Sequence, residues 1–144
     1  MRIEIRFREL PPGKRPPSMR FVCMIFLSTL PDRPFNAVID TGAPFSIVPW
    51  NLWRDGAAMI ESLGDYPDWR NIRGIAGGGV PCEFGRIGVM LADATPARSG
   101  WLSVSAQLAR SDHVPLILGV AGFLDTYELV LNRDGAGYIV VAGA

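Results

Sequence analysis

Short apolar runs interrupted by glycine and proline extend along nearly the whole chain. The 144 residues include 16 glycines and 12 prolines, two residue types that end helices and interrupt central strands. Short runs between turn residues are typical of strands, and a helical period occurs at only two places. The sequence therefore predicts a single, mostly β domain over residues 1–144, closed or barrel-like, with one or two short helices.

The expected elements follow from alternation and from the positions of the breakers. Residues 2–8 alternate charged and apolar side chains, as a half-buried strand does. Proline-rich segments predict a loop at 10–17 and a turn at 31–34, and Asn132-Arg133-Asp134-Gly135 predicts a hairpin turn. We expect the remaining strands at 19–30, 35–39, 45–48, 72–76, 86–92, 101–108, 116–118, 129–131 and 138–141, and helices at 50–63 and 121–127.

Composition limits the partners and the compartment. Fourteen basic residues balance fourteen acidic ones, so no net field attracts nucleic acid or anionic lipid. The most apolar stretch, residues 21–27, is far shorter than the ~20 residues of a membrane helix, and residues 1–8 alternate too regularly for a signal peptide. We expect a cytoplasmic protein with no nucleic-acid or membrane partner, and we expect Cys23 and Cys82 to be reduced and buried.

Asp40, Thr41 and Gly42 directly follow the apolar residues Val38 and Ile39. The tripeptide alone is weak evidence, because average composition places it in roughly a few per cent of chains this long, and an ordinary polar turn is then the commoner explanation. The apolar context changes this weighting. A carboxylate delivered by a buried strand is costly unless it is paired or hydrogen-bonded, and a glycine allows close approach of another backbone.

A second apolar run, Leu116-Ile117-Leu118-Gly119, precedes the second predicted helix. With the Asp-Thr-Gly segment it resembles the retropepsin family of retroviral-type, single-domain aspartic proteases, over about residues 21–132. The resemblance implies a closed acid-protease barrel in which the strand bearing Asp40 lies beside the strand ending at Gly119. It also implies a symmetric homodimer: Asp40 of each subunit is catalytic, Thr41 bonds across the interface, and Gly42 lets the two loops meet.

The family also has a glycine-tipped flap between these two segments. Residues 71–86, with glycines at 77–79, match it in position and composition, and an ordinary flexible hairpin is an equally good interpretation. The resemblance implies substrate contacts from the turn and from the flap, and the residues concerned are Ala43, Ile75, Ala76, Gly77 and Gly78. The glycines do not indicate a phosphate site, because no GxGxxG or P-loop follows.

The function implied is hydrolysis of peptide or protein substrates by an aspartic endopeptidase. Two carboxylates in contact share one proton and activate a water, so no metal or cofactor is required. One alternative is a non-catalytic module of the same fold that dimerises or binds peptides. Another is an unrelated β-sandwich that carries a chance Asp-Thr-Gly turn.

Several other residues are weaker candidates for chemistry. His113 is predicted to lie in a surface turn, and Asp125-Thr126 lacks the glycine of a second motif. For the aromatic residues Tyr66, Trp69 and Trp101, packing is the more common role than lining a substrate pocket.

The chain also departs from the viral members of the family. Pro44 follows the motif, residues 50–70 form an extra segment, and residues 1–20 and 134–144 are additions. We therefore expect a cellular or bacterial relative whose dimer interface is built differently or is weaker.

Overall fold

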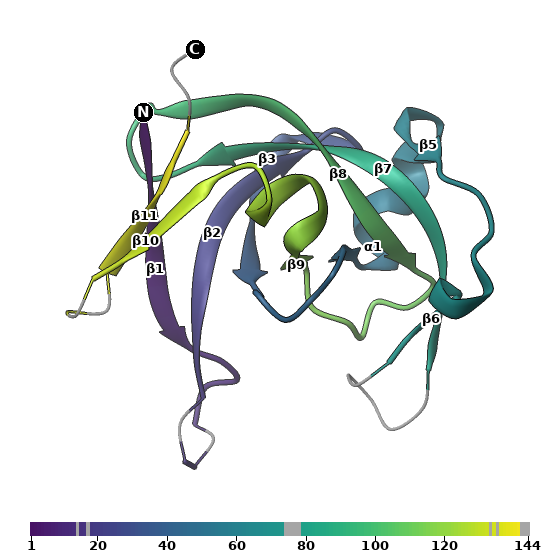
Figure 1. The fold of residues 1–144 in the computed structure, drawn as a ribbon, viewed down its shortest axis with the longest axis horizontal. Coiled ribbons are helices and arrows are strands. Elements are labelled where there is room, and N and C mark those ends of the chain that lie inside the picture. Colours follow the sequence, from purple (N-terminus) through teal and green to yellow (C-terminus); the bar gives the residue numbers. More distant parts are fainter. Residues whose placement is uncertain (14, 17, 74–78, 133, 135, 142–144) are drawn as a thin grey trace.

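The computed structural model describes residues 1–13, 15, 16, 18–73, 79–132, 134 and 136–141. Strands dominate, which confirms the expected mostly β fold (Figure 1). The strands are β1 (Arg2–Glu9), β2 (Met19–Leu27), β3 (Leu30–Ile39), β4 (Ser46–Val48), β5 (Glu61–Ser62), β6 (Asn71–Ile72), β7 (Val80–Ala92), β8 (Arg98–Ala109), β9 (Ile117–Leu118), β10 (Glu128–Leu131) and β11 (Ala136–Val140). The helical segments are α1 (Trp50–Trp53), the 3-10 turns η1 (Arg54–Met59) and η2 (Pro67–Trp69), and the π-type turn η3 (Val120–Leu124).

The strands form one sheet in the order β10-β11-β1-β2-β3-β9-β4-β8-β7-β5, and β6 pairs separately with β7. An additional pairing of β2 with β7 joins β2, β3, β9, β4, β8 and β7 into a ring. The predicted closed barrel is not confirmed, because β4 and β9 contribute only three and two residues to this ring.

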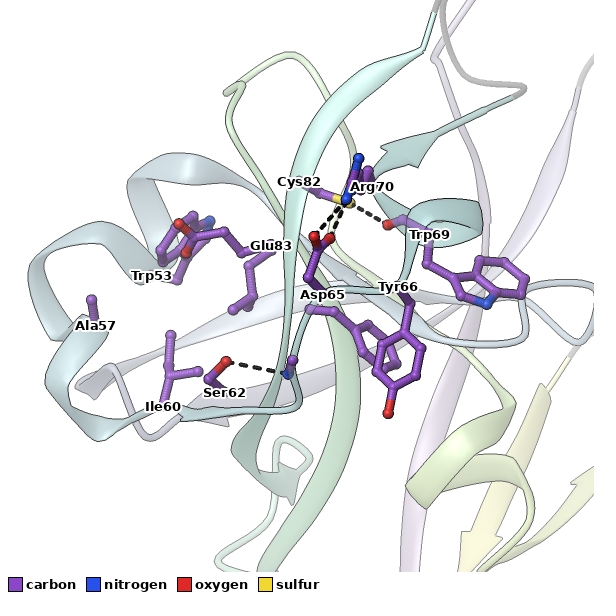
Figure 2. A pocket seen from close by; sticks show the side chains of 13 residues that line it. Trp53, Ala57, Ile60, Ser62, Asp65, Tyr66, Trp69, Arg70, Cys82 and Glu83 are labelled. Carbon is purple, nitrogen blue, oxygen red and sulfur yellow. Dashed lines mark hydrogen bonds and ion pairs between the residues drawn. The ribbon is translucent and has the colours of Figure 1, made fainter.

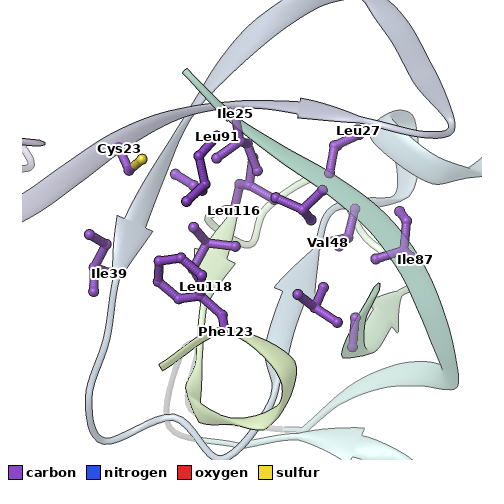
Figure 3. Close-up of a cluster of buried hydrophobic side chains, with 14 of the residues drawn as sticks. Cys23, Ile25, Leu27, Ile39, Val48, Ile87, Leu91, Leu116, Leu118 and Phe123 are labelled. Carbon is purple, nitrogen blue, oxygen red and sulfur yellow. The ribbon is translucent and has the colours of Figure 1, made fainter. Parts of the chain in front are cut away.

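Alternate residues of the long strands point into the main apolar core, as the period of two requires (Figure 3). A second, smaller cluster consists of Ile47, Ile72, Ala109, Val114 and Ile117. Phe123 of η3 is fully buried in this core, so η3 is fixed to the sheet; truncating such a side chain typically costs about 3–5 kcal/mol. Cys23 is buried as expected, and burial, with a smaller contribution from Asp93, raises the pKa of its thiol to about 12. Cys82 is only half-buried, and both cysteines are free.

The turn predicted at residues 31–34 is wrong. The chain reverses at Ser28 and Thr29, and Pro31 and Pro34 lie within β3. Proline is tolerated there because β9 pairs only with the far end of β3, at residues 38 and 39. The first half of β3 therefore has a free edge, where no ladder bond is lost.

The helix predicted over 50–63 is also largely wrong. It ends as α1 and η1 at residue 59, and Glu61 and Ser62 form a strand. Gly56 has non-helical φ and ψ of −108° and 20°, and a Cβ at this position would lie 2.7 Å from Thr29. Packing against the 28–29 turn therefore sets the path of this segment. The second helix, expected at 121–127, is the shorter η3, in which Gly122 has a φ of 85°.

Asp93 joins β1 to the end of β7. Its carboxylate accepts hydrogen bonds from the Glu4 N–H at 3.0 Å and the Thr95 N–H at 2.8 Å, and also from the Thr95 hydroxyl. Burial acts to raise the pKa of Asp93, but these hydrogen bonds, with a contribution from Arg98, lower it overall below its usual value. Among the described residues, no helix has the length and apolar character needed to span a membrane.

Candidate active site

Asp40 lies at the point where β3 leaves the sheet. β3 pairs in parallel with β9, with Val38 opposite Ile117 and Ile39 opposite Leu118. The Asp40 N–H donates to the Leu118 carbonyl at 3.0 Å. The expected neighbourhood of the two apolar segments is therefore confirmed, and a backbone hydrogen bond fixes the position of Asp40 at the end of the strand.

A tight turn then orients the carboxylate. The Ala43 N–H donates to the Asp40 carbonyl at 3.2 Å, and the Gly42 N–H donates to Asp40 Oδ1 at 2.9 Å. The Asp40 side chain is half-buried, whereas Thr41 and Gly42 are exposed. One carboxylate oxygen is thus held by the turn, and the turn presents Thr41 to solvent.

Gly119 is the point of closest contact between the two segments. A Cβ at Gly119 would lie 2.4 Å from the Phe45 carbonyl oxygen and 2.6 Å from that of Ala43. The Gly119 N–H donates to Ser46 Oγ at 3.1 Å, and the next residue, Val120, donates to the Ala43 carbonyl at 2.9 Å. The end of β9 and the start of η3 therefore pack against the backbone of residues 43–45, which follows Asp40. Only a glycine fits at position 119, because a side chain there would clash with this backbone.

Asp40, Gly42 and Ala43 line a cleft of about 310 Å³. Its walls combine apolar side chains with a few polar ones; the other lining residues are Pro44, Phe45, Ile47, Asp68, Trp69, Asn71, Ile72, Arg73, Gln107 and Ile117. Of the predicted site residues, Thr41 does not line this cleft. The lining therefore combines apolar side chains with two carboxylates, those of Asp40 and Asp68.

A hairpin borders the cleft on one side. Asn71 of β6 pairs with Pro81, and Ile72 pairs with Val80 at the start of β7. The arm residues 71–73 line the cleft. The predicted contacts Ile75, Ala76, Gly77 and Gly78 lie outside the described residues. The expected hairpin between 71 and 86 is present in its arms, and its function as a flap stays a prediction.

Aromatic side chains form another part of the wall. The rings of Phe45 and Trp69 meet edge to face with centroids 4.8 Å apart, and Phe45 also packs on Phe84 at 4.7 Å. Gln107 Nε2 and Cys82 Sγ donate to the Trp69 carbonyl at 3.3 and 3.1 Å, which fixes the backbone of η2. Sequence reasoning missed Phe45 and Gln107. The available signal was weak, because Gln107 is one of several polar residues in β8, beside Ser103 and Ser105.

A larger cavity of about 540 Å³ shares Trp69 with the cleft but contains no residue of the Asp-Thr-Gly turn (Figure 2). Asp65, Tyr66 and Arg70 line this cavity, and the Arg70 guanidinium donates two hydrogen bonds to the Asp65 carboxylate at 2.7 and 2.5 Å. Burial raises the pKa of the Cys82 thiol in its wall to about 11, with Gln107 acting in the opposite direction and Glu83 in the same one.

The remaining candidates lie away from the cleft. Trp101 lines a separate groove with Met59 and Arg86. His113 is exposed, as expected. Asp125 accepts from the Gly122 N–H at 2.9 Å and so stabilises η3. Within the described ranges, no three His, Cys, Asp or Glu side chains are grouped to hold a metal ion.

Comparison with solved structures relates the fold to a known one. The chain is similar to a retropepsin-like aspartic protease from Rickettsia conorii, with 12% identity, a TM-score of 0.50, and coverage of 100% of this chain and 94% of that one. It is also similar to EIAV protease complexed with the inhibitor HBY-793, with 20% identity, a TM-score of 0.42, and coverage of 78% and 88%. No protein-family model and no curated protein matches the sequence. The fold is retropepsin-like.

Proposed function

We propose that the chain is an aspartic endopeptidase that acts as a symmetric homodimer with Asp40 of each subunit in one catalytic pair. The observation that carries this proposal is the position of Asp40. Its carboxylate emerges from a strand end that β9 and Gly119 hold in place, and it opens into a cleft bordered by a hairpin.

The chemistry follows from bringing two such carboxylates together. Two carboxylates in contact cannot both ionise readily, so they share one proton and titrate as a unit. The ionised member takes a proton from a water held between them, and the protonated member donates to the substrate carbonyl. The reaction needs no metal and no cofactor, and Gly42 supplies an N–H that orients each carboxylate.

The exposure of the turn supports the dimer. One chain provides a single Asp40 to its cleft, so the pair requires a second copy. Thr41 is exposed and lies outside the cleft, which leaves its hydroxyl free to bond across a two-fold axis in the manner the resemblance implies. Gly42 has no side chain to hold the two turns apart.

The lining of the cleft indicates the substrate class. Ala43, Ile47, Ile72 and Ile117 provide an apolar surface beside Asp40, so we expect extended peptides with apolar residues flanking the cleaved bond. We assign residues 71–86 as the flap, with Ile75, Ala76, Gly77 and Gly78 closing over the peptide and excluding water. A cytoplasmic location and the absence of nucleic-acid and membrane partners stay predictions from the sequence.

The test is cleavage of a peptide library across about pH 4 to 7, the range in which a shared-proton pair works. Asp40→Asn removes the ionisable group and is expected to abolish cleavage while leaving the melting curve close to that of the wild type. Asp32→Asn is the matched control, because Asp32 is exposed at the opposite end of the same strand. Full activity of Asp40→Asn would contradict the mechanism. No cleavage by a folded, dimeric wild type would instead favour the non-catalytic peptide-binding module.

A further inference from the structure

Asp68 is a carboxylate in the wall of the Asp40 cleft that the proposed chemistry does not use. It lies in η2, between Pro67 and Trp69, and it lines the cleft together with Trp69. Both residues are exposed, Trp69 to 37%. A charged group at this place meets the molecule that occupies the cleft, so it can determine which peptides bind there.

The charge of Asp68 is not neutralised by its own neighbours. None of the ion pairs between described residues includes Asp68. The nearby Arg70 is held elsewhere, because its guanidinium donates two hydrogen bonds to the Asp65 carboxylate, at 2.7 and 2.5 Å (Figure 2). Arg73 lines the same cleft, but it too makes no ion pair with Asp68. Within the described part of the chain, the Asp68 carboxylate is therefore left to pair with a positive group of a ligand.

The backbone on the C-terminal side of Asp68 is tied to the sheet. The Trp69 carbonyl accepts hydrogen bonds from Gln107 of β8 and Cys82 of β7, at 3.3 and 3.1 Å. The Cys82 N–H donates to the Arg70 carbonyl at 2.9 Å. These bonds hold η2 against the cleft before any ligand is present, and such preorganisation reduces the entropy lost on binding.

We propose that Asp68 makes the cleft selective for peptides that carry an arginine, whose guanidinium pairs with the Asp68 carboxylate while its methylene stem lies against Trp69. The inference rests on the proposed function, because it names the substrate class of the same cleft. A planar guanidinium forms two parallel hydrogen bonds with a carboxylate and stacks on an aromatic ring, and a lysine ammonium matches this geometry less well. The apolar lining still takes apolar side chains beside the cleaved bond, so the expected substrate contains both kinds of residue.

Two other charged groups of the cleft would give different preferences. Asp40 is the second carboxylate of the lining, and Arg73 is a cation in it. In the proposed dimer the two Asp40 carboxylates share a proton and act on the substrate carbonyl, so a guanidinium bound there would interfere with the reaction. Arg73 would repel an arginine and favour an acidic residue. Substitutions at these two positions therefore distinguish their effects from that of Asp68.

The test compares peptides that differ at one position. A cleaved apolar peptide is resynthesised with arginine or norleucine at each position in turn, and kcat/KM is measured for each peptide. At one position, we expect the wild type to prefer arginine by about fivefold, the upper end of the range for an exposed ion pair. Asp68→Asn is expected to remove this preference. Asp32→Asn, which neutralises an exposed carboxylate at the far end of β3, is the matched control and is expected to keep it.

Charge reversal gives a stronger contrast. Asp68→Arg is expected to disfavour arginine and to favour glutamate at the same position, whereas Arg73→Gln is expected to leave arginine favoured. Raising the salt concentration from about 0.1 M to about 1 M is expected to reduce the wild-type preference, because salt screens an exposed pair. Equal kcat/KM for arginine and norleucine at every position overturns the inference, and so does an unchanged preference in Asp68→Asn.

Peptide binding separates this inference from the proposed function. Fluorescence anisotropy of labelled peptides on Asp40→Asn measures the preference without cleavage and without the second carboxylate. A preference that persists in Asp40→Asn and is lost when Asp68→Asn is added belongs to Asp68.

The outcomes of the two measurements can be told apart. If the wild type cleaves nothing, the same comparison is made with the peptide of the library that binds most tightly. An arginine preference that depends on Asp68 then stands, while the proposed function fails. If cleavage depends on Asp40 but no position favours arginine, the proposed function stands and the selectivity fails. If no peptide is cleaved or bound, both fail.

Discussion

Replacing Gly119 by alanine tests whether β9 positions the catalytic turn. The new methyl carbon would lie 2.4 Å from the Phe45 carbonyl oxygen, whereas ordinary contact begins at 3.4 Å, so the segments must separate by about 1.0 Å (3.4 minus 2.4). Both obstacles, the carbonyls of Phe45 and Ala43, are backbone and cannot rotate away. The backbone of Gly119 has a φ of −104°, which any residue adopts, so the effect is purely steric.

The energetic cost has two parts. Separation breaks the hydrogen bonds from Val120 to Ala43 and from Ala121 to Pro44, each worth about 1 kcal/mol. Overpacking of a tight site adds about 1–3 kcal/mol. We expect a loss of about 3–5 kcal/mol in the free energy of unfolding, which lowers the melting temperature of a domain of this size by roughly 10–15 °C.

Circular dichroism melts and peptide cleavage measure the two consequences. Gly100→Ala is the matched control, because it adds the same methyl group where no atom lies within 4 Å. It is expected to change stability by less than about 0.5 kcal/mol. Gly119→Ala is expected to lose activity even where it is fully folded, since the Asp40 turn moves with its support. A Gly119→Ala protein that melts within about 2 °C of Gly100→Ala and cleaves normally would refute the reasoning.

Two further predictions concern stability and specificity. Asp93→Asn weakens the bond to the Glu4 N–H and is expected to cost about 1–2 kcal/mol at neutral pH. The pKa of Asp93 is lowered in the folded state. The extra stability of the wild type over Asp93→Asn is therefore full above the ordinary pKa of an aspartate and is lost as pH falls through the lowered value. Denaturant titrations of both proteins at pH 7 and 3 check this, and an equal difference in unfolding free energy at the two pH values would contradict it. Trp69→Ala removes the edge-to-face partner of Phe45 from the cleft and is expected to lower kcat/KM about tenfold for peptides with large apolar side chains. Trp101→Ala, in a separate groove, is the control, and equal losses in the two variants would argue against the proposed cleft.

Local sequence pattern was sufficient to predict the strands that show clear alternation or a clear apolar run. Alternation identified β1, and the apolar runs before Asp40 and Gly119 identified two strands that lie side by side. The same reasoning failed at Pro31 and Pro34, where proline signals a turn but the strand continues. A lone proline does not reveal whether its strand has a neighbour on that side, because the neighbour is distant in sequence.

Some features of the candidate site could likewise be predicted from the sequence, and others could not. The sequence by itself determined the chemical groups, because Asp40, Thr41 and Gly42 and their apolar approach are contiguous and each acts through its own covalent structure. Only the tertiary structure decided which residues surround them. Phe45, Trp69, Gln107 and Ile117 reach the same cleft from separate elements, and the need for glycine at 119 arises from two carbonyls that lie more than seventy residues earlier. Contacts of this kind depend on how strands pair over long separations, which no local periodicity encodes.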